Sequence, residues 1–225
     1  MNKKEWIKKS LSKFTINNIT TPCVSAVIYS MLMPASASWY HVLVGALFGI
    51  IIGKLVFGGT GQNIFNPAAL GRLVATICFG NKWTYSSNSF YDVAIGGTPL
   101  QQLQENLANI GNYKLSNMFL GFIPGTLGEI SAICIILGAI YLLLRKSADF
   151  RQMASMLVSF IIIMFVAGLK LDVNPLEYTI YHVLSGGFLF GLVFMITDPV
   201  TTPTTAPGRV IFGTLVASIV ALLCL

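Results

Sequence analysis

Two acidic residues lie inside or beside apolar stretches of this 225-residue chain, where a carboxylate is costly to bury. Glu129 lies within a long apolar segment and has no cationic residue within three positions on either side. Asp198 opens the polar break TDPVTTPTTAPGR and is followed by a proline. Either carboxylate could lie on a path for an ion or a proton. For Asp198, a local role as a helix N-cap or turn former is an equally good interpretation.

A third candidate is the hydroxyl group of Thr98, in the segment DVAIGGTPL (Asp92–Leu100). The preceding pair Gly96-Gly97 and the following proline are typical of a flexible turn. Such a turn would leave the hydroxyl accessible to a modifying enzyme. Taken alone, the same string is also typical of an ordinary surface loop.

The sequence otherwise offers little for catalysis, and we predict no catalytic residue and no metal site. The two histidines, His41 and His182, lie at the expected outer ends of apolar segments, which favours interfacial placement over metal ligation. The string GGTGQN lacks the Lys-Ser/Thr pair of a phosphate-binding loop. Single cysteines in apolar stretches form no metal or dithiol motif, and we expect them to be buried: Cys23, Cys78, Cys134 and Cys224.

The composition indicates the class of protein that must position these groups. Hydrophobic residues make up 55% of the chain and charged residues 10%, with a mean hydropathy of +0.75. Roughly a quarter of the residues in a soluble domain are charged, so this chain suits lipid better than water. The formal charge of +6 is concentrated in a basic leader and in the turn 145–151. This clustering is a membrane-topology signal and argues against nucleic acid as a partner.

Apolar runs long enough to cross roughly 30 Å of hydrocarbon predict about seven helical spans. They cover residues 22–36, 41–57, 67–79, 119–144, 153–169, 180–196 and 210–225. We therefore predict an all-α polytopic membrane protein, with residues 21–225 in a single transmembrane domain and an outer polar loop over residues 81–117. Residues 1–20 form a basic leader, for which an interfacial helix and a disordered segment both fit.

The distribution of lysine and arginine beside the spans predicts a cytoplasmic N-terminus. This orientation puts GGTGQN and TDPVTTPTTAPGR on the inside and the polar loop on the outside. The string GALFGIII (45–52) is similar to GFLFGLVF (187–194), and each precedes a break with an Asx-Pro pair and then Gly-Arg. We interpret this as an internal repeat whose breaks line a site at the repeat interface. Chance similarity of two apolar runs is the alternative.

Four strings carry a family resemblance: GKLVFGGTGQNIFNPAALGR, GTLGE, LSGGFLFG and TDPVTTPTTAPGR. In this order they closely resemble the D subunit of the Rnf electron transport complex. They are also similar, less closely, to the B subunit of the sodium-translocating NADH:quinone reductase. The resemblance implies a subunit of a redox-driven Na⁺ or H⁺ pump that relays electrons between ferredoxin and NAD. It implies partner subunits, one of them a second flavin-bearing subunit, and the bacterial inner membrane as the location.

The resemblance also implies a cofactor site. Family members carry FMN esterified through its phosphate to a threonine of a D-x-x-[S/T]-G-A-T motif, and a flavin transferase attaches it. Asp92, Gly96 and Thr98 match this motif, whereas Ile95 replaces its Ser or Thr and Gly97 its Ala. The expected covalent FMN site is therefore Thr98, surrounded by Asp92, Gly96 and Gly97. A non-covalent riboflavin is also associated with this kind of subunit.

Family members have further helices before the region of Thr21 and after that of Leu225, so this chain is expected to be a form shortened at both ends. Two other functions fit the sequence. The chain could be a channel or transporter that kept the repeat fold and lost its redox function. It could also be a purely structural subunit.

Overall fold

The structure is a computed structural model of the chain. It describes residues 17–58, 61–80, 83, 85–86, 95–96, 98–100, 103, 114–185 and 187–225. Most of the leader predicted for residues 1–20 therefore lies outside the described residues, as does much of the loop 81–117. Within this loop, Asp92 and Gly97 are outside the described residues, whereas Gly96 and Thr98 are inside.

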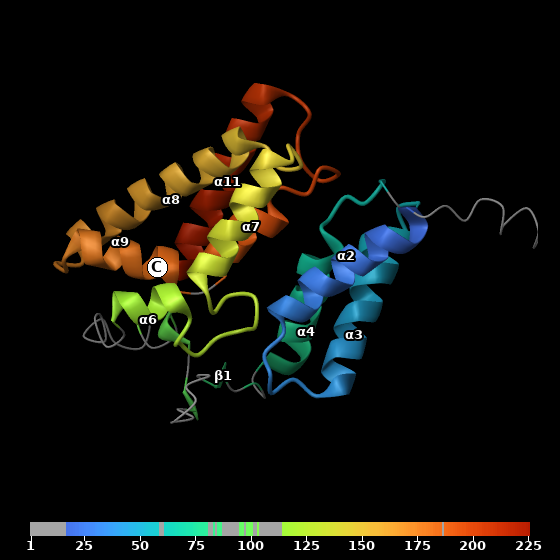
Figure 1. Cartoon of the computed structure of the whole chain (residues 1–225), viewed down its shortest axis with the longest axis horizontal. Coiled ribbons are helices and arrows are strands. Elements are labelled where there is room, and N and C mark those ends of the chain that lie inside the picture. Colours follow the sequence, from blue (N-terminus) through green and yellow to red (C-terminus); the bar gives the residue numbers. More distant parts are fainter. Residues whose placement is uncertain are drawn as a thin grey trace, which may run out of the picture.

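The described chain is mostly helical and forms two groups of helices (Figure 1). The N-terminal helix group contains α2 (Asn17–Leu32), α3 (Trp39–Ile50), the π-helical turn η1 (Ile51–Leu55) and α4 (Pro67–Phe79). The C-terminal helix group contains α6 (Leu115–Leu120), α7 (Ala132–Leu144), α8 (Phe150–Lys170), α9 (Pro175–Leu184), α10 (Phe188–Phe190), the π-helical turn η4 (Gly191–Met195) and α11 (Ala206–Cys224). Between the groups, β1 (Tyr85–Ser86) and β2 (Ile95–Gly96) pair antiparallel, with Tyr85 opposite Gly96.

Glycines allow close packing inside the N-terminal helix group. A Cβ atom added at Gly45 would lie 2.7 Å from the carbonyl oxygen of Gly71, and one at Gly49 would lie 2.5 Å from the carbonyl oxygen of Pro67. Small residues therefore let α3 and α4 approach each other backbone to backbone, as they do in many membrane helix pairs. The hydroxyl of Tyr29 on α2 donates to the carbonyl oxygen of Val42 at 3.1 Å and ties α2 to this pair.

The C-terminal helix group holds the larger hydrophobic core. Helix α8 packs against α9 and α11. The rings of Phe160 on α8 and Phe188 on α10 stack at 3.8 Å between centroids, with 19° between their planes. Tyr181 and Met164 are buried in the same core. Aromatic stacking of this kind adds to the packing of a core that already excludes solvent.

Each helix group contains the same sequence of elements around a break, as the internal repeat predicts. In the N-terminal helix group, η1 ends at Leu55 and α4 starts at Pro67. In the C-terminal helix group, η4 ends at Met195 and α11 starts at Ala206. A π-helical turn before each break loosens the regular hydrogen-bond pattern of the helix, and π-turns are frequent at functional sites.

The prediction of one continuous span over residues 119–144 is wrong in its first part. Helix α6 ends at Leu120, and its C-cap Gly121 has a φ of 105°, in the left-handed region that favours glycine. Helix α7 begins only after Ser131, whose hydroxyl oxygen accepts a hydrogen bond from the backbone N–H of Cys134 at 3.5 Å. Pro124, between them, disfavours helix at the residue before it. Glu129 therefore lies in an irregular segment, 121–131, and not inside a helix.

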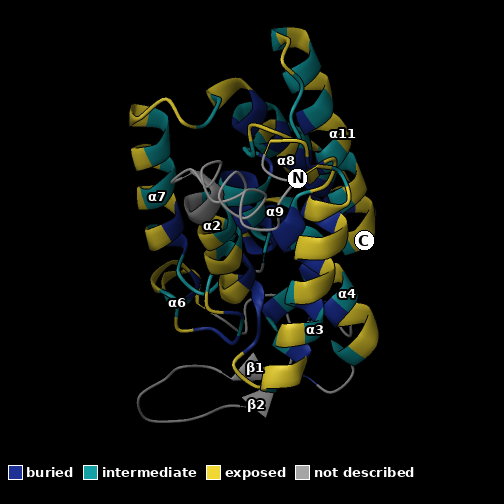
Figure 2. Ribbon diagram, turned by 90° about the vertical axis from the view of Figure 1, so that its right-hand side faces the viewer, coloured by how far each residue is buried: buried dark blue, intermediate teal, exposed yellow. Residues whose placement is uncertain are grey.

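The predicted class, an all-α polytopic membrane protein, is confirmed. In the described part of the chain, two helices, α8 and α11, are long and apolar enough to cross a membrane. A third candidate joins α9 to residues 188–195 with a bend of 62°, across a break that includes Gly186, outside the described residues. Four shorter apolar helices correspond to the other predicted spans: Thr21–Leu32, Trp39–Leu55, Pro67–Phe79 and Ala132–Leu144. Exposed residues run along the outer faces of α3, α7 and α11 (Figure 2), and many of them are large and apolar.

Candidate functional site

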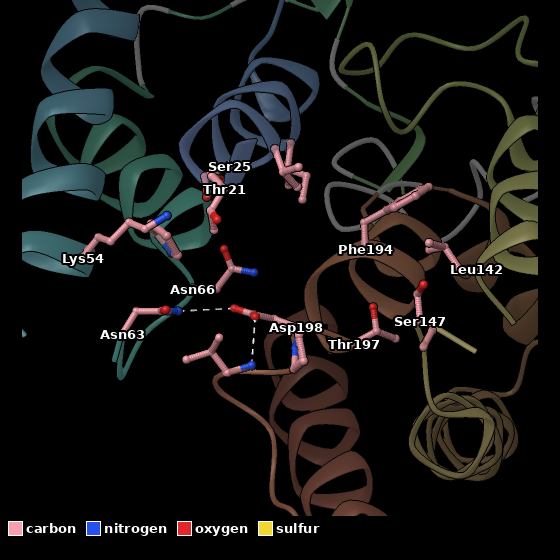
Figure 3. A pocket seen from close by; sticks show the side chains of 16 residues that line it. Thr21, Ser25, Lys54, Asn63, Asn66, Leu142, Ser147, Phe194, Thr197 and Asp198 are labelled. Carbon is pink, nitrogen blue, oxygen red and sulfur yellow. Dashed lines mark hydrogen bonds between the residues drawn. The ribbon is translucent and has the colours of Figure 1, made fainter. Parts of the chain in front are cut away.

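A cavity of about 420 Å³ lies where the breaks of the two helix groups meet. Its walls are mostly apolar, from residues such as Val24, Ile28, Leu142 and Phe194. Its polar side chains come from both groups: Thr21, Ser25, Lys54, Asn63, Asn66, Ser147, Thr197 and Asp198. Figure 3 shows Lys54, Asn63 and Asn66 on one side, Ser147, Thr197 and Phe194 on the other, and Asp198 between them. We call this space the inter-group cavity.

Asn66 holds the two breaks together at this cavity. Its Oδ1 atom accepts hydrogen bonds from the backbone N–H groups of Ala68 at 3.0 Å and Ala69 at 3.4 Å, which caps α4. Its Nδ2 atom donates to the carbonyl oxygen of Met195, the last residue of η4, at 3.4 Å. One side chain therefore satisfies backbone groups at a helix start in one group and at a helix end in the other.

Asp198 lies at the cavity as a turn former and not as a helix cap. Its Oδ1 atom accepts from the backbone N–H of Val200 at 3.1 Å, the pattern of an Asx turn. Its Oδ2 atom accepts from Nδ2 of Asn63 at 3.5 Å, across the boundary between the groups. The N-cap of α11 is Thr205. The turn interpretation of Asp198 is thus confirmed, while its role on an ion path stays a prediction.

The structure also places Lys54 in the wall of this cavity, a residue for which no site role was predicted from the sequence. Lys54 is part of η1 and its residue surface is 4% exposed. The carboxylate of Asp198 attracts its ammonium group electrostatically. A sequence signal did exist: a lysine within the apolar run GIIIGKLVF is rare unless it has a function.

Glu129 lies at a second contact between the two helix groups, and it is not among the residues that line the inter-group cavity. Its Oε1 atom would be 2.7 Å from a Cβ atom added at Gly187, so a side chain there would displace the carboxyl group. The neighbouring backbone N–H of Gly128 donates to the carbonyl oxygen of Met31 on α2 at 2.8 Å. Arg72 on α4 acts electrostatically on the carboxylate. The two candidate acids are therefore both at the group boundary, but in separate places.

Arg72 belongs to a cluster of aromatic residues beside this boundary. Its guanidinium carbon lies 4.6 Å from the centre of the Trp83 ring. The Trp83 indole N–H donates to Nδ1 of His41 at 3.1 Å, and the His41 ring stacks on Phe79. The imidazole of His182, in α9, is also buried, with Nδ1 2.9 Å from the carbonyl oxygen of Tyr178. Among the described residues, no group of three His, Cys, Asp or Glu side chains could hold a metal ion.

The expected burial of the cysteines is wrong for three of the four. Cys23, Cys78 and Cys134 are exposed, and Cys224 is partly buried. In a membrane protein the exposed helix faces contact lipid, so an apolar position in the sequence need not face the protein interior. None of the four forms a disulfide within the described chain.

Thr98 is half-buried and is followed by the fully buried Pro99. A few residues on, Leu103 is buried in the same core cluster as Met118 of α6 and Ile123. Before it, Ile95 and Gly96 form β2. Of the four expected flavin-site residues, the structure describes Thr98 and Gly96, and the role of Thr98 as a flavin site stays a prediction.

Together, these features define a helical membrane protein with two interrupted helix groups and, between the interruptions, a mostly apolar cavity with a few polar side chains. The sequence profile of the NQR2, RnfD, RnfE family matches residues 4–225. The chain therefore belongs to this family.

Curated relatives are B subunits of the Na(+)-translocating NADH-quinone reductase. The protein of Chromohalobacter salexigens is 36% identical over 208 residues, which are 89% of this chain and 50% of the relative. Those of Ectopseudomonas mendocina and Azotobacter vinelandii are 35% and 34% identical, and each match covers 89% of this chain and 51% of the relative. The chain thus spans about half the length of these relatives.

Proposed function

We propose that the chain is the flavin-carrying membrane subunit of a redox-driven ion pump of the Rnf or NADH-quinone reductase type. The observation that carries this proposal is the family match over residues 4–225, which includes the threonine segment and both breaks. Relatives that are B subunits of the Na(+)-translocating NADH-quinone reductase support coupling of electron transfer to ion movement. The chain would relay electrons between ferredoxin and NAD, coupled to Na⁺ or H⁺ translocation, in the bacterial inner membrane with its N-terminus in the cytoplasm.

The proposed site of covalent FMN is Thr98. Its half-buried hydroxyl lies between β2 and the buried Pro99, so a flavin esterified there would be attached to an anchored stretch of chain. Ile95 pairs with Ser86 through its backbone, and this pairing needs no hydroxyl at position 95. The departure of Ile95 from the family motif is therefore compatible with the local fold. A flavin transferase would be required as a partner.

The inter-group cavity is the proposed site of the non-covalent flavin. Its volume of about 420 Å³ is in the range of small-molecule sites, which are typically apolar with a few placed polar groups. The ammonium of Lys54 offers hydrogen-bond donors, and Phe194 offers an aromatic wall. These residues suit a planar ring system with carbonyl oxygens. The ring would supply one- and two-electron chemistry, while the protein supplies orientation and charge.

Glu129 and Asp198 are the proposed ion-path residues. Both lie where the two helix groups meet, and both approach groups of the N-terminal half: Arg72 for Glu129 and Asn63 for Asp198. Irregular backbone at membrane depth is tolerated where it lines protein or water. The break that contains Asp198 and the segment 121–131 that contains Glu129 both have irregular backbone.

Flavin fluorescence tests this function directly. The chain is produced together with an active flavin transferase and separated on a denaturing gel, where covalent flavin fluoresces under ultraviolet light. We expect a fluorescent band for the wild type and for Thr202→Ala, a threonine in the second break, and none for Thr98→Ala. A dark wild-type band with active transferase would refute flavin attachment.

A channel or transporter without redox function is the second candidate. The observation in its favour is the cavity between two breaks in corresponding elements, an arrangement typical of repeat transporters. The two functions differ in one outcome. A transporter of this kind would move ions in vesicles that contain neither flavin nor reductant, whereas the redox protein would not.

A further inference from the structure

Lys54 carries a positive charge into the interior of the protein, and neither the ion-path residues nor the threonine site explains why. It belongs to η1, is only 4% exposed, and lies in the wall of the inter-group cavity. A charged ammonium group beside mostly apolar cavity walls is destabilising unless water or other groups in the cavity bind it. Its presence here therefore calls for an acceptor.

The described protein does not supply that acceptor. Among the described residues, Lys54 donates no hydrogen bond, and no carboxylate oxygen lies within 4.0 Å of its nitrogen. The Asp198 carboxylate attracts the Lys54 ammonium group electrostatically, but from more than 4.0 Å away. The oxygens of Asp198 already accept hydrogen bonds from Asn63 and Val200. The carboxylate is thus bound by its own surroundings, and the donors of Lys54 are available to the cavity.

The lining of the cavity limits which kinds of acceptor could bind there. Phe194, Leu142 and Ile28 give the cavity apolar walls, whereas its polar groups are concentrated near the two breaks (Figure 3). A strongly hydrated anion would lose its water against these walls. A ring with carbonyl oxygens at one edge would place apolar surface on the walls and oxygens towards the ammonium group.

We infer that Lys54 donates a hydrogen bond to the non-covalent flavin of the inter-group cavity and makes the site bind reduced flavin more tightly than oxidised flavin. This inference rests on the proposed function, namely that a flavin occupies the cavity. Reduction of the ring by two electrons, with uptake of one proton from water, leaves it with one negative charge. The electrons come from the electron donor of the proposed complex. A positive charge beside the ring stabilises that negative charge in a medium of low polarity.

Riboflavin binding to the purified full-length chain tests the inference. A Thr98→Ala background removes the proposed covalent flavin, and anaerobic equilibrium dialysis gives the dissociation constant of oxidised and of dithionite-reduced riboflavin. With Lys54 present, we expect reduced riboflavin to bind about tenfold tighter than oxidised riboflavin. For a two-electron couple this ratio equals a rise in midpoint potential of about 30 mV. Lys54→Met should make the two constants equal, and Lys54→Arg should keep the preference.

The stability of the flavin-free chain provides a second measurement. Replacing a charged side chain that the described protein does not bind with the similarly shaped, uncharged Met side chain should raise the thermal unfolding midpoint. The matched control is Lys170→Met, at the exposed end of α8, which should change neither the midpoint nor riboflavin binding. A lower midpoint in Lys54→Met would mean that the protein itself binds the ammonium, and would overturn the inference.

The outcomes separate the inference from the function on which it rests. If no variant binds riboflavin in either redox state, the flavin site in the cavity is refuted and the inference falls with it. If riboflavin binds but Lys54→Met keeps the preference for the reduced form, the flavin site stands and the role of Lys54 is refuted. If Lys54→Arg loses the preference as fully as Lys54→Met, charge is not the cause, and the inference is again overturned.

Discussion

The side chain of Asn66 donates a hydrogen bond to the backbone carbonyl of Met195, 129 residues further along the chain. The same side chain caps α4. The start of one interrupted helix is thereby connected to the end of the π-helical turn in the other group. Together with the pair Asn63 and Asp198, this contact closes the boundary beside the inter-group cavity. The two breaks thus form one polar unit, although each belongs to its own helix group.

We predict that Asn66→Ala lowers the stability of the protein by about 1–3 kcal/mol. The loss of an N-cap costs about 0.5–2 kcal/mol, and the hydrogen bond between the groups contributes about 1 kcal/mol. Asn66→Ser separates the two, because serine can cap α4 but is too short to reach Met195. Chemical unfolding in detergent should place Asn66→Ser between wild type and Asn66→Ala. Equal losses in both variants would show that the contact between the groups, and not the cap, carries the effect.

Gly49→Ala should separate α3 from α4. The added methyl group would lie 2.5 Å from the carbonyl oxygen of Pro67, a backbone atom that cannot move alone. Overpacking of this kind costs about 1–3 kcal/mol. Gly191→Ala is the matched control, because the nearest atom to its methyl group would be the Met195 sulfur at 4.0 Å. Thermal unfolding should show a clear loss for Gly49→Ala and none for Gly191→Ala; similar midpoints for both would contradict the tight helix contact.

Glu129→Gln should slow redox-driven uptake of Na⁺ or H⁺ into vesicles several-fold. The amide has nearly the shape of the carboxyl group, so the approach to Gly187 is kept while the charge is lost. Covalent flavin, measured by in-gel fluorescence, should be unchanged. Glu177→Gln, in the first turn of α9, changes the same charge at another place and should leave uptake as it is. Unchanged uptake in Glu129→Gln would exclude this carboxyl from the ion path.

Protonation of Asp149 should make the folded protein less stable in acid. This residue caps α8, and the backbone N–H of Arg151 is the main cause that lowers the pKa of its carboxyl from the usual 3.8, with Arg209 adding to the effect. A carboxyl whose pKa is lowered by folding stabilises the protein above pH 3.8, and this stabilisation is lost as the pH falls towards the lower pKa of the folded state. The side chain is partly exposed, so solvent weakens the effect. The unfolding midpoint of Asp149→Asn should therefore fall less between pH 5 and about pH 3 than that of the wild type; parallel curves would contradict this role.

Local features of the sequence were sufficient to locate most of the helices and the two breaks marked by Asx-Pro pairs, but not the interruption at residues 121–131. Apolar segments long enough for membrane helices occur where the structure has helices, because a backbone in lipid must satisfy its own hydrogen bonds. The two Asx-Pro pairs mark both breaks, yet they differ in local role. Asn66 caps α4 directly, whereas Asp198 forms a turn seven residues before the N-cap Thr205. The two Asx-Pro pairs therefore lie at different distances from the start of the helix that follows, although the residues around them are similar.

The tertiary structure decided which charges are buried and what they face. The class of protein, the positions of the breaks and the threonine segment follow from composition and short strings, because hydrophobicity and proline act over a few residues. The burial of Lys54 beside Asp198 depends on contacts between residues more than a hundred positions apart. The irregular segment around Glu129 likewise depends on α2 and on Gly187. Such contacts arise only when the two helix groups pack, which no local pattern records.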